Sequence, residues 1–241
     1  MSSPVGSITF VHGIGGSPRT FHHQIEAFAG SPLSFVRLPA RRSIENGENH
    51  GKCDVWSAVA SVEQQILQLA HRPRLVVGHS MGGILAALAA TRNPQLIDSL
   101  IILDSNLPIT GEARLSRSEL TRLGDPDDQW RRISESLMSM TGTISEADIA
   151  EIATGLARVD GSCAYELVRT ALSIDSIDLW KRLPVDTTYV ASARQLDSEA
   201  MTSINARVRV VSLPGGHWPH IESSRDVNDI IRTQWTSLHQ S

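Results

Sequence analysis

A serine lies at the centre of the segment Gly78-His-Ser80-Met-Gly82, and its hydroxyl group is the strongest candidate nucleophile in the chain. The apolar residues 75–77 before this segment predict a short buried strand, and the small apolar residues 84–90 after it predict a helix. A G-x-S-x-G motif between a strand and a helix is typical of a nucleophile elbow, in which the chain turns so sharply that the first and last positions must be glycine. We therefore predict that Ser80 performs nucleophilic chemistry; an ordinary tight turn is the alternative.

A histidine late in the chain could supply the base that such a serine needs, because a hydroxyl is a poor nucleophile until its proton is removed. His217 follows a predicted strand at residues 208–212, and the two glycines before it would let its ring swing over the elbow. His220 is close in sequence but follows a proline and lacks this strand-to-loop position. We predict that His217 is the general base.

Two backbone N–H groups would have to stabilise the oxyanion that forms when a serine attacks a carbonyl. The residue after the nucleophile, Met81, offers one, and Ile14 in the glycine-rich loop 11–16 offers the other. A dinucleotide-binding loop is the competing interpretation of residues 11–16, but Pro18 occupies its third glycine position and no acidic residue follows at the ribose-binding distance. We expect three further residues to line the substrate pocket: Gly13, His79 and Trp218.

The elements that would position these groups alternate between strand and helix along most of the chain. Strands are predicted at residues 7–11, 33–38, 75–77, 100–103, 187–191 and 208–212. Helices are predicted at residues 19–29, 55–69, 84–90 and 226–235. This alternation predicts an α/β fold in which a mostly parallel sheet is covered by helices on both faces.

The alternation stops between residues 106 and 183, where the pattern is helical. Helices are predicted at residues 127–138, 145–157 and 163–172, with a short turn at 177–183. A plain connection of this length is unusual in a compact domain, so we predict an inserted helical cap at residues 106–183 on a core formed by residues 1–105 and 184–241. The larger apolar side chains of the cap would either line a pocket or pack its helices together: Trp130, Leu137, Met138, Met140, Tyr165, Leu172 and Trp180.

The composition excludes several function classes. The chain has 241 residues, of which 41% are hydrophobic and 20% charged, and its net charge is −4. That is typical of one globular domain without the basic stripe that nucleic acid would need, and no apolar stretch is long enough to span a bilayer. The N-terminus does not resemble a signal peptide.

Cys53 and Cys163 are too few for a disulfide framework or a zinc site, and no histidines and carboxylates stand at metal-ligand spacing. We therefore expect reduced cysteines, with a bond between the two as the alternative, no metal or organic cofactor and a cytoplasmic location, while the oligomeric state stays open.

Taken together, these motifs resemble those of the α/β-hydrolase superfamily. The resemblance rests on His12-Gly-Ile-Gly-Gly16, Gly78-His-Ser-Met-Gly-Gly83, Leu103-Asp-Ser105 and Gly216-His217, and it covers nearly all of the chain. It implies the α/β-hydrolase fold and a catalytic triad in the order serine, acid, histidine. The acid would hold the imidazole in the right tautomer and stabilise its charged form.

Two aspartates are candidates for that acid. Most of the superfamily carries it in a Gly-x-x-Asp turn after the strand that follows the cap, but residues 190–199 contain Asp197 without that turn. Asp104 ends the predicted strand 100–103, where a subset of the superfamily that includes haloalkane dehalogenases and zearalenone-type lactonases places its acid. We predict Asp104; the alternatives are Asp197 and a triad acid that is neither of the two.

The function that this resemblance implies is a serine hydrolase that cleaves a carboxylic ester or lactone of a small, largely apolar molecule through an acyl-enzyme. Three alternatives remain open. A thioesterase acting on carrier-bound acyl chains would agree with Leu38-Pro-Ala-Arg-Arg42, which resembles the Leu-Pro-Gly-Arg of such enzymes, although the missing Gly-x-x-Asp argues against it. A non-hydrolytic enzyme (a lyase, cofactor-less oxygenase or cyclase) would use His217 as a base on substrate. A ligand-binding receptor would keep the fold without turnover.

Overall fold

A single parallel sheet organises the part of the chain that the computed structural model describes, residues 6–38, 53–69, 71–105, 124–192 and 198–240. Its strand order is β2-β1-β3-β4-β5-β6, and every neighbouring pair is parallel. The strands are β1 (Ser7–Val11), β2 (Leu33–Val36), β3 (Arg74–His79), β4 (Ser99–Leu103), β5 (Asp186–Ala191) and β6 (Val208–Ser212). The order reverses direction between β1 and β3, and the carboxyl edge of a sheet at such a switch point is where α/β proteins bind ligands.

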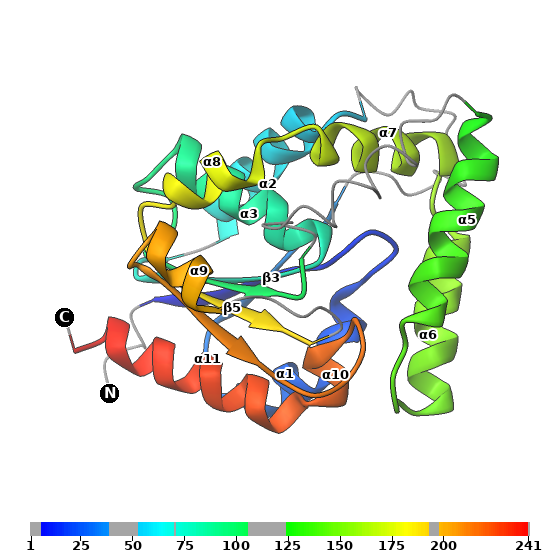
Figure 1. The fold of residues 1–241 in the computed structure, drawn as a ribbon. Coiled ribbons are helices and arrows are strands. Elements are labelled where there is room, and N and C mark those ends of the chain that lie inside the picture. Colours follow the sequence, from blue (N-terminus) through cyan, green and yellow to red (C-terminus); the bar gives the residue numbers. More distant parts are fainter. Residues whose placement is uncertain (1–5, 39–52, 70, 106–123, 193–197, 241) are drawn as a thin grey trace.

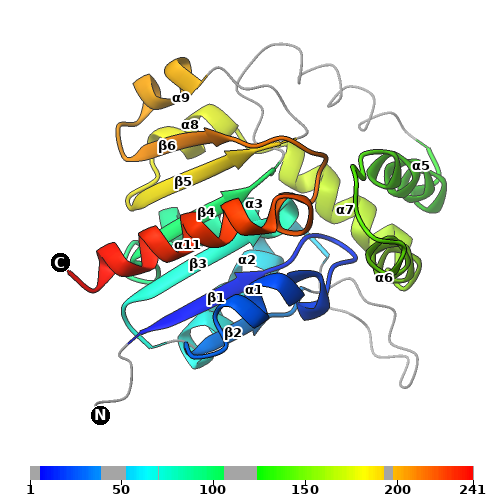
Figure 2. The same ribbon diagram turned by 90° about the horizontal axis from the view of Figure 1, so that it is seen from below.

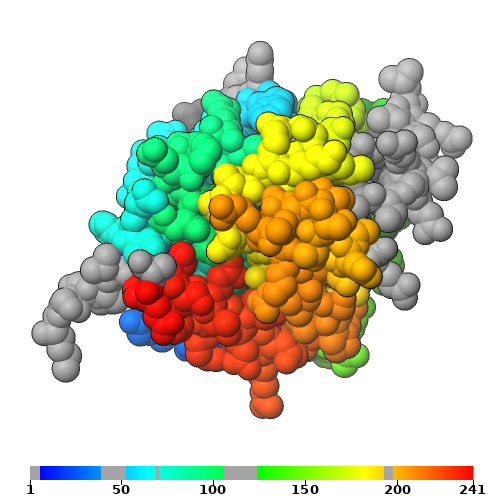
Figure 3. All heavy atoms as spheres, turned by 60° about the vertical axis from the view of Figure 1, so that its left-hand side comes forward, coloured from blue at the N-terminus to red at the C-terminus, as the bar shows by residue number. Residues whose placement is uncertain are grey.

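Helices cover both faces of the sheet, as the alternation predicted (Figure 1). One layer contains α2 (Val55–Leu69), α3 (Met81–Arg92), α7 (Gly161–Leu172), α8 (Ser176–Lys181) and α9 (Ser198–Ile204). The other contains the 3₁₀ helix η1 (Pro18–Phe21), α1 (His22–Ala27), α10 (Pro219–Glu222) and α11 (Ser224–Leu238). On the side of the molecule away from α5 and α6, α8, α9 and α11 lie one below another on the surface (Figure 3). The α/β class and its two helical layers are therefore confirmed.

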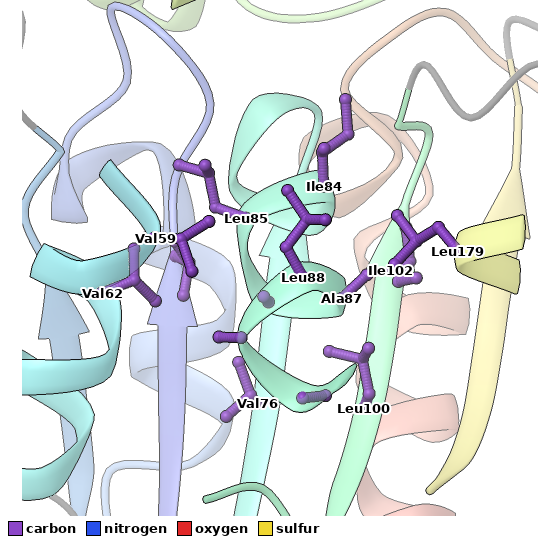
Figure 4. Packing of buried hydrophobic residues seen from close by; sticks show 14 of the residues in the cluster. Val59, Val62, Val76, Ile84, Leu85, Ala87, Leu88, Leu100, Ile102 and Leu179 are labelled. Atoms are coloured by element: carbon purple, nitrogen blue, oxygen red, sulfur yellow. The ribbon is translucent and has the colours of Figure 1, made fainter. Parts of the chain in front are cut away.

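The core between the sheet and the helix layer that contains α2 and α3 is built from aliphatic side chains at regular spacing. Val59 and Val62 of α2 are fully buried and face Leu85 and other residues of α3, and α3 packs onto β3 and β4 through side chains such as Val76 (Figure 4). Burying one such side chain contributes about 1.5–3 kcal/mol. All five residues of β4 are buried, which explains why residues 100–103 form a continuous apolar run rather than an alternating one.

Two further helices, α5 (Pro126–Ser139) and α6 (Glu146–Ala157), stand at one end of the sheet, and the carboxyl ends of the strands point toward them (Figures 1 and 2). They lie in the segment predicted to be a cap and are called the cap helices below; α5 packs against α7 of one layer and α6 against η1 of the other. The Asp125 side chain caps α5 by accepting the Asp127 and Asp128 N–H groups, and the Ser145 side chain caps α6. The helices predicted at residues 127–138 and 145–157 thus occur within about two residues of their expected ends. No helix among the described residues is both long enough and apolar enough to traverse a bilayer.

A disulfide bond joins Cys53 to Cys163, so the expectation of two reduced cysteines is wrong. Cys53 lies just before α2 and Cys163 lies in the first turn of α7. These two helices pack against each other, which brings the Cα atoms within 5.1 Å although the residues are 110 positions apart. The sequence reasoning failed because a count of cysteines does not reveal which helices become neighbours. The bond connects the segment between β4 and β5 covalently to the helix layer of the core.

Candidate active site

Ser80 stands alone between β3 and α3 in a strained backbone conformation. Its φ and ψ angles are 52° and −121°, a region that costs a non-glycine residue about 1–3 kcal/mol. Two hydrogen bonds hold the turn: the Ser80 N–H donates to the Leu103 carbonyl at 2.9 Å, and the Ser105 hydroxyl donates to the Ser80 carbonyl at 2.6 Å. Neighbouring strand β4 therefore supports the conformation that the β3-to-α3 turn requires.

Glycine is required on both sides of Ser80 because backbone from other segments lies too close. A Cβ atom at Gly82 would lie 2.2 Å from the Val11 carbonyl oxygen at the end of β1. A Cβ atom at Gly78 would lie 2.6 Å from the Gly83 Cα atom. The first turn of α3 thus packs directly on the chain leaving β1, which is the geometry that the G-x-S-x-G spacing predicted.

The structure brings Ser80, His217 and Asp104 together in one hydrogen-bonded chain. The Ser80 Oγ lies 3.0 Å from His217 Nε2, and His217 Nδ1 lies 2.8 Å from Asp104 Oδ2. Both the histidine and the aspartate are buried. An ionised carboxylate can only accept hydrogen bonds, so Asp104 selects the tautomer in which His217 Nδ1 carries the hydrogen. His217 Nε2 is then the atom that can take the proton of Ser80.

Asp104 occupies the end of β4 in a left-handed backbone conformation, with φ of 40°. Its second carboxylate oxygen accepts the Ser192 N–H at 3.0 Å, and its own N–H donates to the Val190 carbonyl at 2.8 Å. The side chain is completely buried, so these contacts replace the water that an ionised carboxylate would otherwise bind. The other sequence candidate, Asp197, lies outside the described residues.

The two predicted oxyanion donors, Met81 and Ile14, border the same cavity as Ser80. Met81 begins α3, so its N–H has no partner within the helix, and the helix dipole favours negative charge at this end. Ile14 lies in the loop after β1, and the neighbouring Gly13 sits against the elbow, since a Cβ there would be 3.0 Å from the Ser80 Cβ. Within the described part of the chain, neither the Ile14 nor the Met81 N–H donates to a backbone carbonyl in a turn, loop or cap. No such backbone bond therefore competes with a ligand for these two donors.

Two more histidines lie buried behind His217. The His79 Nε2 donates to the His217 carbonyl at 2.7 Å, and burial together with the neighbouring His217 lowers the pKa of His79 to about 3. The His79 ring also lies 4.5 Å from the ring of His220. Burial lowers the pKa of His220 well below its usual value too. Neither ring nitrogen of His220 has a hydrogen-bond partner among the described residues. His79 and His220 are therefore both neutral at physiological pH.

A cavity of about 840 Å³ opens beside Ser80 and His217. The three residues expected to line the pocket, Gly13, His79 and Trp218, all border it. So do Trp130, Leu137, Met140 and Leu172, whereas Met138, Tyr165 and Trp180 of the same expected set do not. Trp180 instead packs beside Tyr189 in the core and donates its indole N–H to the Met201 carbonyl at 3.1 Å. The remaining lining is mostly apolar, and its polar side is formed by three exposed residues: Asp125, which caps α5, and Asp128 and Arg132 of α5.

Sequence reasoning missed a carboxylate that contacts the backbone around His217. Glu222, at the end of α10, accepts the Gly216 N–H at 2.7 Å. The only available signal was an acidic residue five positions after a candidate catalytic histidine, which spacing alone does not distinguish from a solvated side chain. No cluster of three or more histidine, cysteine, aspartate or glutamate side chains that could hold a metal ion occurs in the described ranges.

Comparisons with known proteins agree with this architecture. A model of the alpha/beta hydrolase family matches residues 10–230. The sn-1-specific diacylglycerol lipase ABHD11 of Mus musculus is 24% identical over 255 residues, which cover 93% of this chain and 79% of the lipase. The enol-lactonase from Burkholderia xenovorans LB400 superposes with a TM-score of 0.75 at 14% identity, covering 97% of this chain and 92% of that one. The epoxide hydrolase CorEH superposes with a TM-score of 0.74 at 20% sequence identity, and the match covers 98% of this chain and 93% of that one. Since the family model spans most of its length, this chain belongs to the alpha/beta hydrolase family.

Proposed function

We propose that this protein is a serine hydrolase that cleaves a carboxylic ester or lactone of a small, largely apolar molecule. The observation that carries the proposal is the hydrogen-bonded chain from Ser80 through His217 to Asp104, which opens onto an apolar cavity. Residues 106–183 would form the cap over that cavity, on a core of residues 1–105 and 184–241. The diacylglycerol lipase and the enol-lactonase among similar proteins support an acyl ester as the substrate class.

The reaction would proceed in two halves through an acyl-enzyme. His217 Nε2 takes the Ser80 proton while Ser80 Oγ forms a bond to the carbonyl carbon, and the resulting oxyanion receives the N–H groups of Ile14 and Met81. The carbon–oxygen bond to the alcohol then breaks, and His217 gives its proton to the leaving alkoxide. In the second half, His217 takes a proton from water, the hydroxide attacks the acyl carbon, and Ser80 recovers the proton as the carboxylic acid leaves. Asp104 stabilises the imidazolium in both halves.

The apolar lining supports an uncharged substrate that is largely hydrocarbon. Side chains from the cap helices and α7, such as Trp130, Leu156 and Leu172, would bury the acyl or alcohol group, while the polar side at Asp125 and Arg132 remains open to water. A cytoplasmic location stays a prediction from the sequence. The disulfide argues against a reducing compartment, because glutathione keeps cytosolic thiols reduced.

The experiment that tests the proposal compares ester and lactone turnover in wild type and in Ser80→Ala. p-Nitrophenyl acetate, butyrate and octanoate and a γ-lactone serve as probes, and Ser237→Ala on the exposed face of α11 is the matched control. We expect hydrolysis in wild type and in the control and a loss of at least about 10³-fold in Ser80→Ala. Turnover that persists in Ser80→Ala would instead favour non-hydrolytic chemistry with His217 as the base.

A further inference from the structure

Glu222 occupies a pocket of backbone N–H groups that connects His217 to the cap. Its carboxylate accepts the Gly216 N–H at 2.7 Å and the Trp218 N–H at 3.4 Å, which are the two residues on either side of His217. It also accepts the Gly142 N–H at 3.4 Å, and Gly142 lies in the turn between α5 and α6. One carboxylate therefore joins both flanks of His217 to the cap helices.

The pocket around the carboxylate exists because the surrounding positions lack side chains. A Cβ atom at Gly142 would lie 1.9 Å from the Glu222 Oε2, and a Cβ atom at Gly216 would lie 2.8 Å from the Glu222 Oε1. Gly215 has a φ of +124°, a conformation that side chains rarely adopt, and it places the loop around the same carboxylate. The loop and the cap turn thus have the shape that a carboxylate at Glu222 requires.

The backbone of His217 is held from both sides as well. Its N–H donates to the Met140 carbonyl at 2.9 Å, and Met140 ends α5 beside the same cap turn. Its carbonyl accepts the His79 Nε2 at 2.7 Å, and the Ser192 hydroxyl donates to the Gly216 carbonyl. Of these partners, only Glu222 carries a charge, so its bonds to N–H groups are the charge-assisted ones in the set. The position of the His217 ring is thereby coupled to the position of the cap.

We propose that Glu222 is a positioning residue, which ties the His217 loop to the Gly142 turn of the cap and keeps the imidazole within reach of Ser80 and Asp104. This inference rests on the proposed function, because only a reaction that uses His217 as a base needs that placement. Glu222 does not border the cavity, whereas His217 and Trp218 do. Its loss is therefore expected to affect the chemical step rather than substrate binding.

The first test is Glu222→Gln, which keeps the size of the side chain but turns an NH₂ group toward backbone N–H groups. With p-nitrophenyl butyrate as the probe, we expect kcat to fall by about 10- to 100-fold while KM changes by less than about twofold. Glu135→Gln, on the exposed face of α5, is the matched control and should leave both constants unchanged. A Glu222→Gln enzyme with wild-type kcat, or with a change confined to KM, would overturn the proposal.

A second variant approaches the same contact from the cap. Gly142→Ala places a methyl group against the Glu222 carboxylate and should reduce kcat in the same way. Gly30→Ala is the control, because a Cβ there meets no atom within 4 Å. If Glu222→Gln does not fold, as judged by circular dichroism, Gly142→Ala carries the test, and unchanged kcat in a folded Gly142→Ala enzyme overturns the coupling to the cap.

A spectroscopic measurement separates this proposal from the proposed function. The proton shared between His217 Nδ1 and Asp104 should give a downfield ¹H NMR resonance that is absent in His217→Ala. We expect Glu222→Gln and Gly142→Ala to shift or broaden it while the protein stays folded, and an unchanged resonance would refute the positioning role. Wild-type protein that keeps the resonance but neither hydrolyses the ester nor reacts with a fluorophosphonate would refute the proposed function alone.

Discussion

Replacing Asp104 by asparagine tests how much the buried carboxylate contributes. The carboxylate accepts two N–H groups, from His217 Nδ1 at 2.8 Å and from Ser192 at 3.0 Å, and it has no contact with solvent. An asparagine can accept only one of them with its oxygen. The backbone N–H of Ser192 cannot turn away, so the amide oxygen would face Ser192 and the NH₂ group would face His217.

That arrangement would reverse the tautomer of His217. Its Nδ1 would accept a bond from the amide, and the hydrogen would move to Nε2, the atom that lies 3.0 Å from the Ser80 Oγ. A base that already carries the proton cannot take one, and no charge would remain to stabilise the imidazolium. A wrong tautomer of this kind lowers kcat by about 10⁴-fold, which corresponds to about 5.4 kcal/mol of transition-state stabilisation.

The assay is steady-state hydrolysis of p-nitrophenyl butyrate by Asp104→Asn, with circular dichroism to show that the variant is folded. Asp229→Asn on the exposed face of α11 is the matched control and should retain full activity. We expect kcat/KM to fall by about 10⁴-fold in Asp104→Asn only. A folded Asp104→Asn enzyme within about tenfold of wild type would refute the reasoning, and a comparable loss in Asp197→Asn would assign the acid to that residue instead.

Three further predictions concern acid stability, the disulfide and substrate size. Burial and His217 lower the pKa of His79 from 6.5 to about 3, so between these pH values the unfolded chain binds a proton that the folded protein excludes. The free energy of unfolding should therefore fall on acidification by up to about 1.4 kcal/mol per pH unit. Urea titrations at several pH values would measure this slope, which we expect to be smaller in His79→Gln. Paired replacement of Cys53 and Cys163 by serine should cost about 4–5 kcal/mol, because the bond closes a loop with a sequence separation of 110, and an unchanged urea midpoint would contradict this. Ala171→Phe should fill part of the apolar cavity and lower kcat/KM for p-nitrophenyl octanoate relative to the acetate by about 10-fold or more, whereas an equal loss for both esters would argue against an acyl site there.

The parts of the site that were predicted from the sequence are those encoded by local constraints. The glycines around Ser80 could be interpreted because a sharp strand-to-helix turn tolerates no side chain there, and the strand before the turn and the helix after it are mostly apolar. His217 and Asp104 follow predicted strands, and parallel strands bring such positions to one edge of the sheet. Strand ends were therefore sufficient to nominate all three side chains.

The features that the sequence did not predict depend on contacts between distant segments. Cys53 and Cys163 meet because α2 and α7 pack together, and no local pattern specifies which helix pairs with which. Trp180 resembled a pocket residue by its type, but α8 packs against α3 and α9 and directs it into the core. The contacts of Glu222 likewise require the turn between α5 and α6, whose position only the folded structure provides.

The central claim is that the Ser80 hydroxyl is a nucleophile activated by His217. The most direct measurement is treatment of the protein with a fluorophosphonate, followed by digestion and mass spectrometry to locate the adduct. We predict a single adduct on the peptide that contains Ser80, formed rapidly in wild type and lost in both Ser80→Ala and His217→Ala. An unmodified Ser80 in folded wild-type protein, or equal labelling in His217→Ala, would contradict the account.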